Sequence, residues 1–204
     1  MFTIMDDDGN INMVEEPSHD YTYTYADYLK WQFEERLELF KGKIFKMSVP
    51  NTKHQVVAGN VYIRLRNQLD DQKCQVFIAP FDVRLPVRNR KKDNEITTVV
   101  QPDLCIVCDE TKIDERGCCG APDLVIEILS PGNSQKEVRL KFQLYEEAGV
   151  KEYWIVNPVE ENLVVHVLGE DQKFNGCKMY AGGDRIQSIC ISGLSIDVND
   201  IFKK

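Results

Sequence analysis

The chain has 204 residues, of which 43% are hydrophobic and 28% are charged. This length and composition suit a single globular domain with a sizeable core. No apolar run approaches the roughly 20 residues of a transmembrane helix. The first residues lack the basic and apolar regions of a secretory signal, so we expect a cytoplasmic protein. The formal net charge of -8 argues against a protein that coats nucleic acid by bulk attraction.

The N-terminal part of the sequence is acidic and then becomes regular. Residues 1–20 are polar and show no sustained periodicity, so we predict a disordered acidic tail followed by one domain over residues 21–204. Thr24 and Asp27 form a capping-box-like start for the first helix. Hydrophobic periodicity then predicts a helix over 25–35, a strand hairpin over 37–40 and 44–47, a helix from 51 or 52 to 69, and strands near 75–79 and 82–85. The buried stripe of the second helix is predicted at steps of four residues, at Val57, Val61, Leu65 and Leu69.

Two Pro-Asp-Leu tripeptides, at 102–104 and 122–124, each open a run rich in β-forming residues. Proline lacks the N–H that a central strand needs, so each tripeptide marks the start of a strand, and we expect both strands in the middle of a sheet. Asp103 and Asp123 then lie at strand ends, where we expect their carboxylates to point to one place. Glu127 falls on the same strand face as Asp123. A carboxylate inside a hydrophobic strand is costly unless a cation compensates it.

The helix predicted over 134–148 brings a cation towards these carboxylates. It begins at a capping box, and Val138, Phe142 and Tyr145 form its buried face. Lys141 lies on the flank of that face, so its ammonium can reach the strand ends. The strand, helix, strand order implies a right-handed βαβ crossover. Further strands are predicted over 152–156 and 163–168, with shorter ones after 173.

Asp103, Glu127 and Lys141 together supply the groups that metal-assisted phosphodiester cleavage needs. Carboxylate oxygens hold Mg²⁺ or Mn²⁺, the metal lowers the pKa of a water, and the lysine orients that water or stabilises charge on phosphorus. Each residue alone has a simpler explanation, because Asp103 could merely open a strand and Lys141 could extend to solvent. The combination carries the prediction.

The chain resembles the Uma-type restriction endonucleases of the PD-(D/E)XK nuclease superfamily over roughly residues 24–200. The residues that carry the resemblance are, in order, Glu38, His54-Gln55, Asp103, Glu127 in Ile126-Glu-Ile-Leu-Ser-Pro131, and the pattern Glu137-x-x-x-Lys141-x-x-x-Tyr145-x-x-x-Gly149-Val-x-Glu-Tyr-Trp-x-Val-x-Pro158.

This resemblance implies an α/β restriction-endonuclease-like fold, with an αβββαβ core and a central mixed sheet flanked by helices. It implies a metal-dependent DNA endonuclease, acting as a homodimer, with Mg²⁺ or Mn²⁺ held by Asp103 and Glu127 and a contribution from Glu38. The usual superfamily lysine stands two residues after the acidic residue, a position that is Leu129 here. The Uma-type pattern supplies the lysine from the following helix, which matches Lys141.

Several other residues are candidates with open alternatives. Glu38 could instead pair across its hairpin. Glu137 is explained by helix capping, and the family commonly has Asp there, so its role and that of Asp123 stay open. The candidate nucleic-acid contacts are His54, Arg88, Arg90 and Lys91. His54 could instead be an ordinary residue of the first helical turn, and the three basic residues could belong to a loop that only keeps the surface soluble.

The cysteines favour reduced thiols. There are seven of them, an odd number in a chain without an export signal, which argues against a disulfide framework. Cys105-x-x-Cys108 raises the question of zinc, but a regular strand sends these two side chains to opposite faces, so we expect buried free thiols. Because a fold does not certify an activity, a catalytically inactive nuclease-like binding module and a zinc-stabilised structural protein remain the alternatives.

Overall fold

This computed structural model describes residues 2–5, 11–14, 21–31, 36–69, 73–87, 91–130 and 135–203, with side chains from residue 21 onward. Arg88 and Arg90, predicted as nucleic-acid contacts, and Ser134, the predicted helix cap, lie outside the described residues. Among the described helices, none has both the length and the apolar character that crossing a membrane requires.

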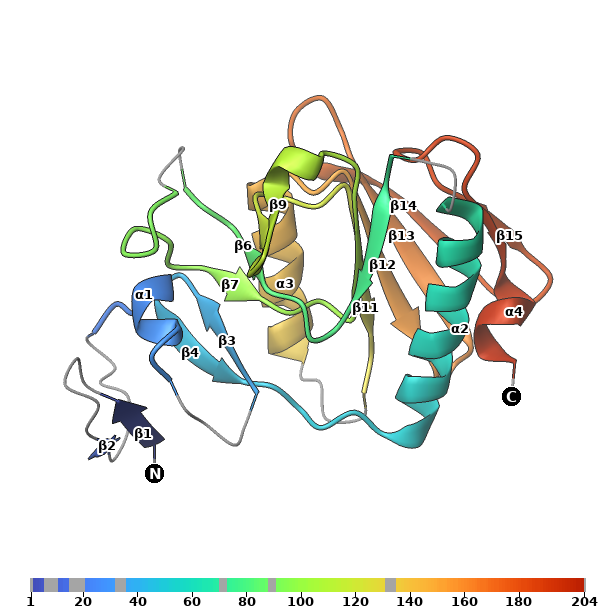
Figure 1. The fold of residues 1–204 in the computed structure, drawn as a ribbon. Coiled ribbons are helices and arrows are strands. Elements are labelled where there is room, and N and C mark those ends of the chain that lie inside the picture. Colours follow the sequence, from blue (N-terminus) through green and yellow to red (C-terminus); the bar gives the residue numbers. More distant parts are fainter. Residues whose placement is uncertain are drawn as a thin grey trace.

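The centre of the molecule is a six-stranded mixed sheet in the order β14-β13-β12-β11-β8-β5 (Figure 1). Its strands are β5 (Gln75–Ile78), β8 (Leu104–Val107), β11 (Leu124–Ile128), β12 (Glu152–Asn157), β13 (Asn162–Leu168) and β14 (Phe174–Tyr180). β11 and β12 pair in parallel, and the other neighbouring pairs are antiparallel. The two Pro-Asp strands are therefore neighbours in the middle of this sheet, as predicted.

Two helices cover opposite faces of the sheet, α2 (Thr52–Leu69) and α3 (Gln135–Ala148) (Figure 1). The predicted stripe of α2 is buried at steps of four residues, and it packs on Leu124, Ile126 and Ile128 of β11. Val125, on the other face of that strand, packs with residues of α3. The alternation expected for β11 is thus confirmed, and it places Glu127 on the α3 side of the sheet.

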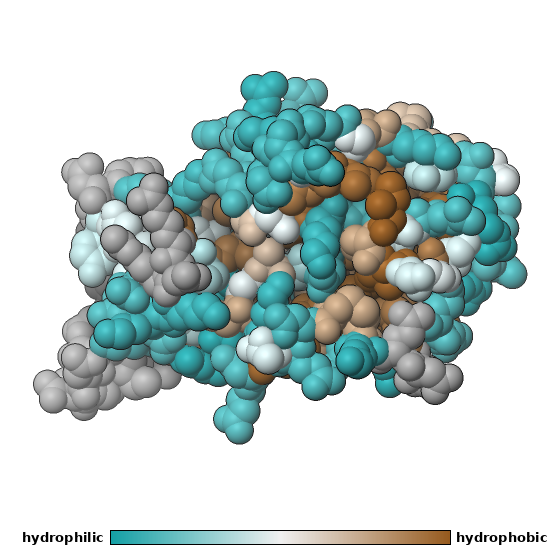
Figure 2. All heavy atoms as spheres, turned by 90° about the horizontal axis from the view of Figure 1, so that it is seen from above, coloured by the Kyte–Doolittle hydropathy of each residue, from teal (hydrophilic) through white to brown (hydrophobic). Residues whose placement is uncertain are grey.

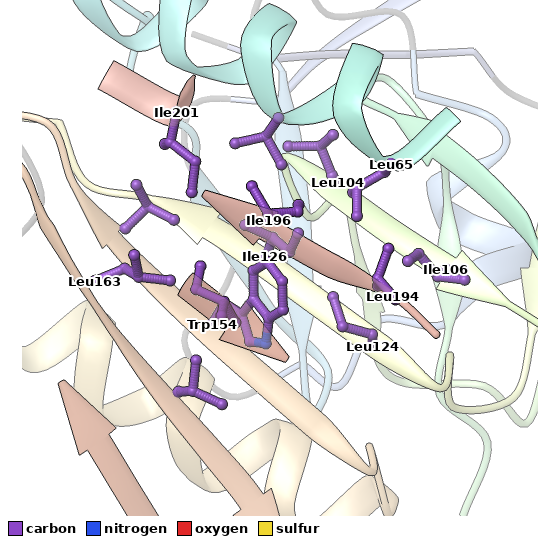
Figure 3. Packing of buried hydrophobic residues seen from close by; sticks show 14 of the residues in the cluster. Leu65, Leu104, Ile106, Leu124, Ile126, Trp154, Leu163, Leu194, Ile196 and Ile201 are labelled. Atoms are coloured by element: carbon purple, nitrogen blue, oxygen red, sulfur yellow. The ribbon is translucent and has the colours of Figure 1, made fainter. Parts of the chain in front are cut away.

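The core on the α2 side also receives the C-terminal part of the chain. Figure 3 shows Ile126 and Trp154 of the sheet close to Leu194 and Ile196. The elements there are β15 (Arg185–Gln187), β16 (Ser195–Asp197) and a terminal helix α4 (Val198–Phe202) that the sequence pattern did not predict. Polar side chains cover much of the face seen in Figure 2, with hydrophobic atoms in patches between them.

A second sheet lies on the N-terminal side, in the order β4-β3-β7-β6-β10-β9 (Figure 1). Its strands are β3 (Leu37–Phe40), β4 (Lys43–Lys46), β6 (Val83–Arg84), β7 (Val99–Val100), β9 (Ile113–Asp114) and β10 (Gly117–Cys119), with the 3-10 helix η1 (Glu110–Lys112) before β9. All four residues of β3 are buried, Glu38 among them. The hairpin β3–β4 was predicted, whereas the division into two sheets was not.

The N-terminal segment differs from the prediction in two places. β1 (Phe2–Met5) and β2 (Ile11–Val14) form an antiparallel pair where a disordered tail was predicted. The first helix, α1 (Tyr25–Tyr28), is shorter than the predicted 25–35. Its start is as expected, because the backbone N–H and the hydroxyl of Thr24 both donate to the Asp27 carboxylate at 2.8 Å.

The prediction of free thiols is wrong for two cysteines. Cys74 and Cys108 form a disulfide, while the described free cysteines are Cys105, Cys118, Cys119, Cys177 and Cys190. β5 pairs antiparallel with β8, with Gln75 opposite Val107, so the next residues outward face each other. This juxtaposition arises from strand pairing across a separation of 34 residues, which cysteine spacing alone does not reveal. Cys105 and Cys108 do belong to opposite faces of the sheet, as expected.

Candidate active site

The direction of β8 decides which of the two Pro-Asp carboxylates enters the site. β8 and β11 are antiparallel, with Leu104 opposite Ile126, and the same register brings position 103 opposite Glu127. The Asp103 carboxylate accepts a hydrogen bond from the backbone N–H of Ile128 at 2.7 Å. Asp103 and Glu127 thus lie side by side at one end of the two strands.

Asp123 lies at the other end of this strand pair. Its carboxylate accepts hydrogen bonds from the backbone N–H of Cys108 at 2.8 Å and from the ammonium of Lys151 at 2.6 Å. The expectation that both tripeptides point their carboxylates to one place is therefore wrong. It would have required the two strands to run in parallel.

Lys141 of α3 joins the carboxylates of two different sheets. Its Nζ lies 3.0 Å from Oε1 of Glu127 on β11 and 3.2 Å from Oε1 of Glu38 on β3. All three side chains are buried, and the backbone N–H of Gln101 also donates to Glu38 at 2.9 Å. Lys141 is itself one of the buried residues of α3, whereas Val138 and Phe142 of the predicted buried face are half-buried, so the predicted flank position is wrong. Its ammonium nevertheless lies among the predicted acidic residues, and Glu38 pairs with this lysine.

Tyr145 contacts the site, although the sequence analysis gave it a packing role and a place in the family pattern and did not name it as a site residue. Its hydroxyl donates a hydrogen bond of 2.6 Å to Oε1 of Glu127, and its side chain is fully buried. Burial and the neighbouring Glu127 carboxylate raise the pKa of Tyr145 well above its ordinary value. The signal was its spacing, because a residue four positions after Lys141 lies on the same side of the helix.

His54 reaches the site from the first turn of α2. Its Nε2 lies 3.1 Å from Oδ2 of Asp103, and the side chain is only 8% exposed. Its backbone N–H donates to the side chain of Asn51, which caps the helix and fixes the start of α2. The histidine predicted as a nucleic-acid contact is thus a buried neighbour of Asp103.

These side chains surround a cavity of about 90 Å³. The predicted residues that line it are Glu38, His54, Asp103, Glu127, Glu137 and Lys141. Arg36 and Gln55, which were not predicted as site residues, line it as well. Lys91 lines a separate cavity near the C-terminal end of α3 and so lies apart from this cluster.

The cavity concentrates negative charge. Burial raises the pKa of Glu127 to about 7 against the opposing effect of Lys141, and the carboxylates of Asp103 and Glu38 add to the rise. Burial opposes the charged form of Lys141, but the Glu127 and Glu38 carboxylates outweigh it and raise the pKa of the lysine. Lys141 is therefore a stable ammonium, and the three carboxylates around it favour a further cation.

Comparison with known proteins identifies the family. Residues 25–199 match the Uma2 family, described as "Putative restriction endonuclease". The chain belongs to the Uma2 family. An uncharacterized protein of Synechocystis sp. (strain PCC 6803) is 25% identical over 180 residues, which cover 87% of this chain and 90% of that protein.

The Uma2 fold has a counterpart among solved structures. A crystal structure from Anabaena variabilis, described as a putative nuclease belonging to DUF820, is similar with a TM-score of 0.68 and 20% sequence identity. The match covers 88% of this chain and 97% of the other. It confirms the predicted α/β nuclease-like fold.

The donor set of this Uma2 protein fits a partly hydrated Mg²⁺ or Mn²⁺. Asp103 and Glu127 present carboxylates beside a cavity, and Mg²⁺ characteristically takes one or two protein carboxylates and completes its shell with water and phosphate oxygens. Within the described ranges, no group of three or more histidine, cysteine, aspartate or glutamate side chains is arranged to hold a metal ion. The candidate ligands are thus the two predicted carboxylates.

Proposed function

We propose that this protein is a metal-dependent endonuclease that hydrolyses phosphodiester bonds in DNA. The observation that carries the proposal is the position of Lys141, whose ammonium lies 3.0 Å from Glu127 inside the cavity that Asp103 also lines. A cation-binding carboxylate pair with a fixed ammonium beside it matches the needs of phosphodiester hydrolysis. Membership of the Uma2 family supports the same reaction class.

In this proposal, Asp103 and Glu127 hold Mg²⁺ or Mn²⁺. When bound, the metal supplies Lewis acidity and lowers the pKa of a water. The two carboxylates come from neighbouring strands, so the sheet itself keeps them side by side. The cavity leaves room for water and for a phosphate oxygen next to them.

Lys141 acts on the water and on the charge that develops at phosphorus. An ammonium carries three N–H donors, and among the described residues two of its contacts go to Glu127 and Glu38. The third donor is then available to a water or a phosphate oxygen. Glu38, on β3 of the second sheet, holds the ammonium in place through a second ion pair.

We also propose that the protein works in the cytoplasm as a homodimer, because cutting both strands of a duplex uses two sites related by a twofold axis. Sedimentation of the purified chain with and without duplex DNA tests the dimer. A monomer under both conditions would contradict it.

The proposal is tested by a cleavage assay on duplex DNA, single-stranded DNA and RNA, with Mg²⁺, with Mn²⁺ and with a chelator. We expect metal-dependent cleavage of DNA that Asp103→Asn abolishes, because the substitution removes a charged ligand and keeps the shape of the side chain. The matched control is Asp123→Asn, which changes the other Pro-Asp motif and should leave cleavage within a few-fold of wild type. A wild-type protein that neither binds metal nor cleaves any substrate would favour the inactive binding module.

A further inference from the structure

The Asp103 carboxylate is held by one of its two oxygens. Among the described residues, the backbone N–H of Ile128 lies 2.7 Å from Oδ2, and Nε2 of His54 lies 3.1 Å from the same atom. Both contacts therefore use Oδ2, and neither uses Oδ1. Two donors from different elements, β11 and α2, prevent the carboxylate from rotating.

The Glu127 carboxylate repeats this arrangement. The hydroxyl of Tyr145 lies 2.6 Å from Oε1, and Nζ of Lys141 lies 3.0 Å from the same oxygen. Both donors come from α3 and are separated by one helical turn. In the described part of the chain, the hydrogen bonds to Glu127 leave Oε2 unused.

We propose that His54 and Tyr145 are positioning residues that hold one oxygen of each carboxylate and so leave Oδ1 of Asp103 and Oε2 of Glu127 for the metal. The inference rests on the proposed metal-dependent function. Side chains that hydrogen-bond to metal-ligating groups orient those ligands and set their basicity, and their loss typically weakens metal binding by about 10- to 100-fold.

The polar contacts of these two side chains go to the carboxylates of Asp103 and Glu127, so both residues act through those carboxylates. Tyr145 is fully buried, and His54 is 6% exposed. Nδ1 of His54 is buried and has no hydrogen-bond partner among the described residues. Nε2 lies within hydrogen-bonding distance of Oδ2 of Asp103, so an N–H at Nε2 donates to that oxygen. His54 thereby acquires a role different from the nucleic-acid contact that the sequence suggested.

The test is calorimetric titration of the full chain with Mn²⁺. We expect His54→Leu and Tyr145→Phe each to weaken Mn²⁺ binding by about 10- to 100-fold. His54→Gln keeps an N–H donor near the position of Nε2 and should bind within a few-fold of wild type. Because the two residues act through the metal, a higher Mn²⁺ concentration should restore the cleavage rate of both weakened variants.

Matched controls separate positioning from general damage to the core. His166→Leu and Tyr153→Phe alter a half-buried histidine and a buried tyrosine that donate no described hydrogen bond to either carboxylate, and both should bind Mn²⁺ like wild type. If His54→Leu fails to fold by circular dichroism, Tyr145→Phe decides alone, because it removes only a hydroxyl.

The outcomes distinguish this inference from the proposed function. Wild-type Mn²⁺ affinity in both His54→Leu and Tyr145→Phe, or in a folded Tyr145→Phe when the histidine variant is lost, overturns the positioning role and leaves the nuclease proposal intact. Equal weakening in the two controls also overturns it. A wild-type chain that shows neither Mn²⁺ binding nor cleavage overturns both proposals.

Discussion

The two ends of the β8–β11–β12 strand group both bury carboxylates, and they do so in different ways. At the cavity end, Glu127 shares the ammonium of Lys141 with Glu38 and lies beside Asp103. At the opposite end, Glu152 on β12 is fully buried and accepts four hydrogen bonds from neutral groups. These come from Nε1 of Trp154 at 2.6 Å, Oγ of Ser188 at 2.8 Å, and the backbone N–H groups of Ile189 at 2.8 Å and Cys190 at 3.1 Å.

The comparison teaches that burial of a carboxylate does not by itself indicate chemistry. Glu152 ties the segment around Ser188 to the central sheet, and its hydrogen bonds replace the water it has lost, so it needs no cation. Glu127 lies among like charges at the edge of a cavity, where a cation lowers the cost of burial. A structural anchor and the proposed active site thus occupy the two ends of the same strands.

The largest expected effect is on the cleavage rate, and it distinguishes Lys141 at the cavity end from Lys151 at the opposite end of the strands. Lys141→Met should lower the rate by about 100- to 1,000-fold even at saturating metal, because in the proposed mechanism the ammonium acts on water and developing charge. Lys151, whose side chain is largely exposed, is the ion-pair partner of Asp123. Lys151→Met removes this partner and should leave the cleavage rate unchanged. Single-turnover cleavage measures both. An equal loss in the two variants would break the division into a reactive and a structural end.

The second effect concerns stability and is expected to differ between the two glutamates. Glu152→Gln places an amide N–H₂ against groups that donate to the carboxylate and should lower the free energy of unfolding by about 3 kcal/mol. Glu127→Gln removes one of several neighbouring negative charges. At pH 8 it should lower the free energy of unfolding by less than about 1 kcal/mol or should raise this free energy. Urea unfolding of the metal-free proteins compares them. A larger loss for Glu127→Gln would reverse our interpretation.

The third effect concerns the disulfide, which closes the β5–β8 pair at the end away from the cavity. Cys74→Ser should lower the free energy of unfolding by about 2 kcal/mol, since the cross-link restricts the unfolded chain. Cys177→Ser, at an exposed free cysteine, is the control and should have no effect. Thiol counting under denaturing conditions checks the pairing directly. Seven reactive thiols before reduction would show that the bond is absent.

The smallest effect is the change in stability on neutralising each Pro-Asp carboxylate. Asp103→Asn should alter the free energy of unfolding by less than about 1 kcal/mol, because the lost hydrogen bonding is offset by relief of carboxylate repulsion. Asp123→Asn has no such relief and should lower it by about 1 kcal/mol; its ion pair with the exposed Lys151 adds little. Thermal unfolding without metal shows which variant loses more stability. A greater loss for Asp103→Asn than for Asp123→Asn would contradict the prediction.

The sequence by itself determined the features that depend on local periodicity. The two-residue alternation of β11 placed Glu127 on the face towards α3, and the four-residue spacing of α2 predicted its buried stripe. Helical spacing also directed Lys141 towards the strand ends, although the structure buries this residue more deeply than the predicted flank position. These positions follow from residues close in the chain, so the pattern alone sufficed for them.

Only the tertiary structure decided the direction of strand pairing and the partners across sheets. The antiparallel pairing of β8 with β11 separates Asp103 from Asp123, although the two tripeptides are identical in sequence. The disulfide and the contacts of His54 with Asp103 and of Glu38 with Lys141 likewise join residues between 34 and 103 positions apart. Such contacts depend on how the connections between elements close in space, which no local periodicity encodes.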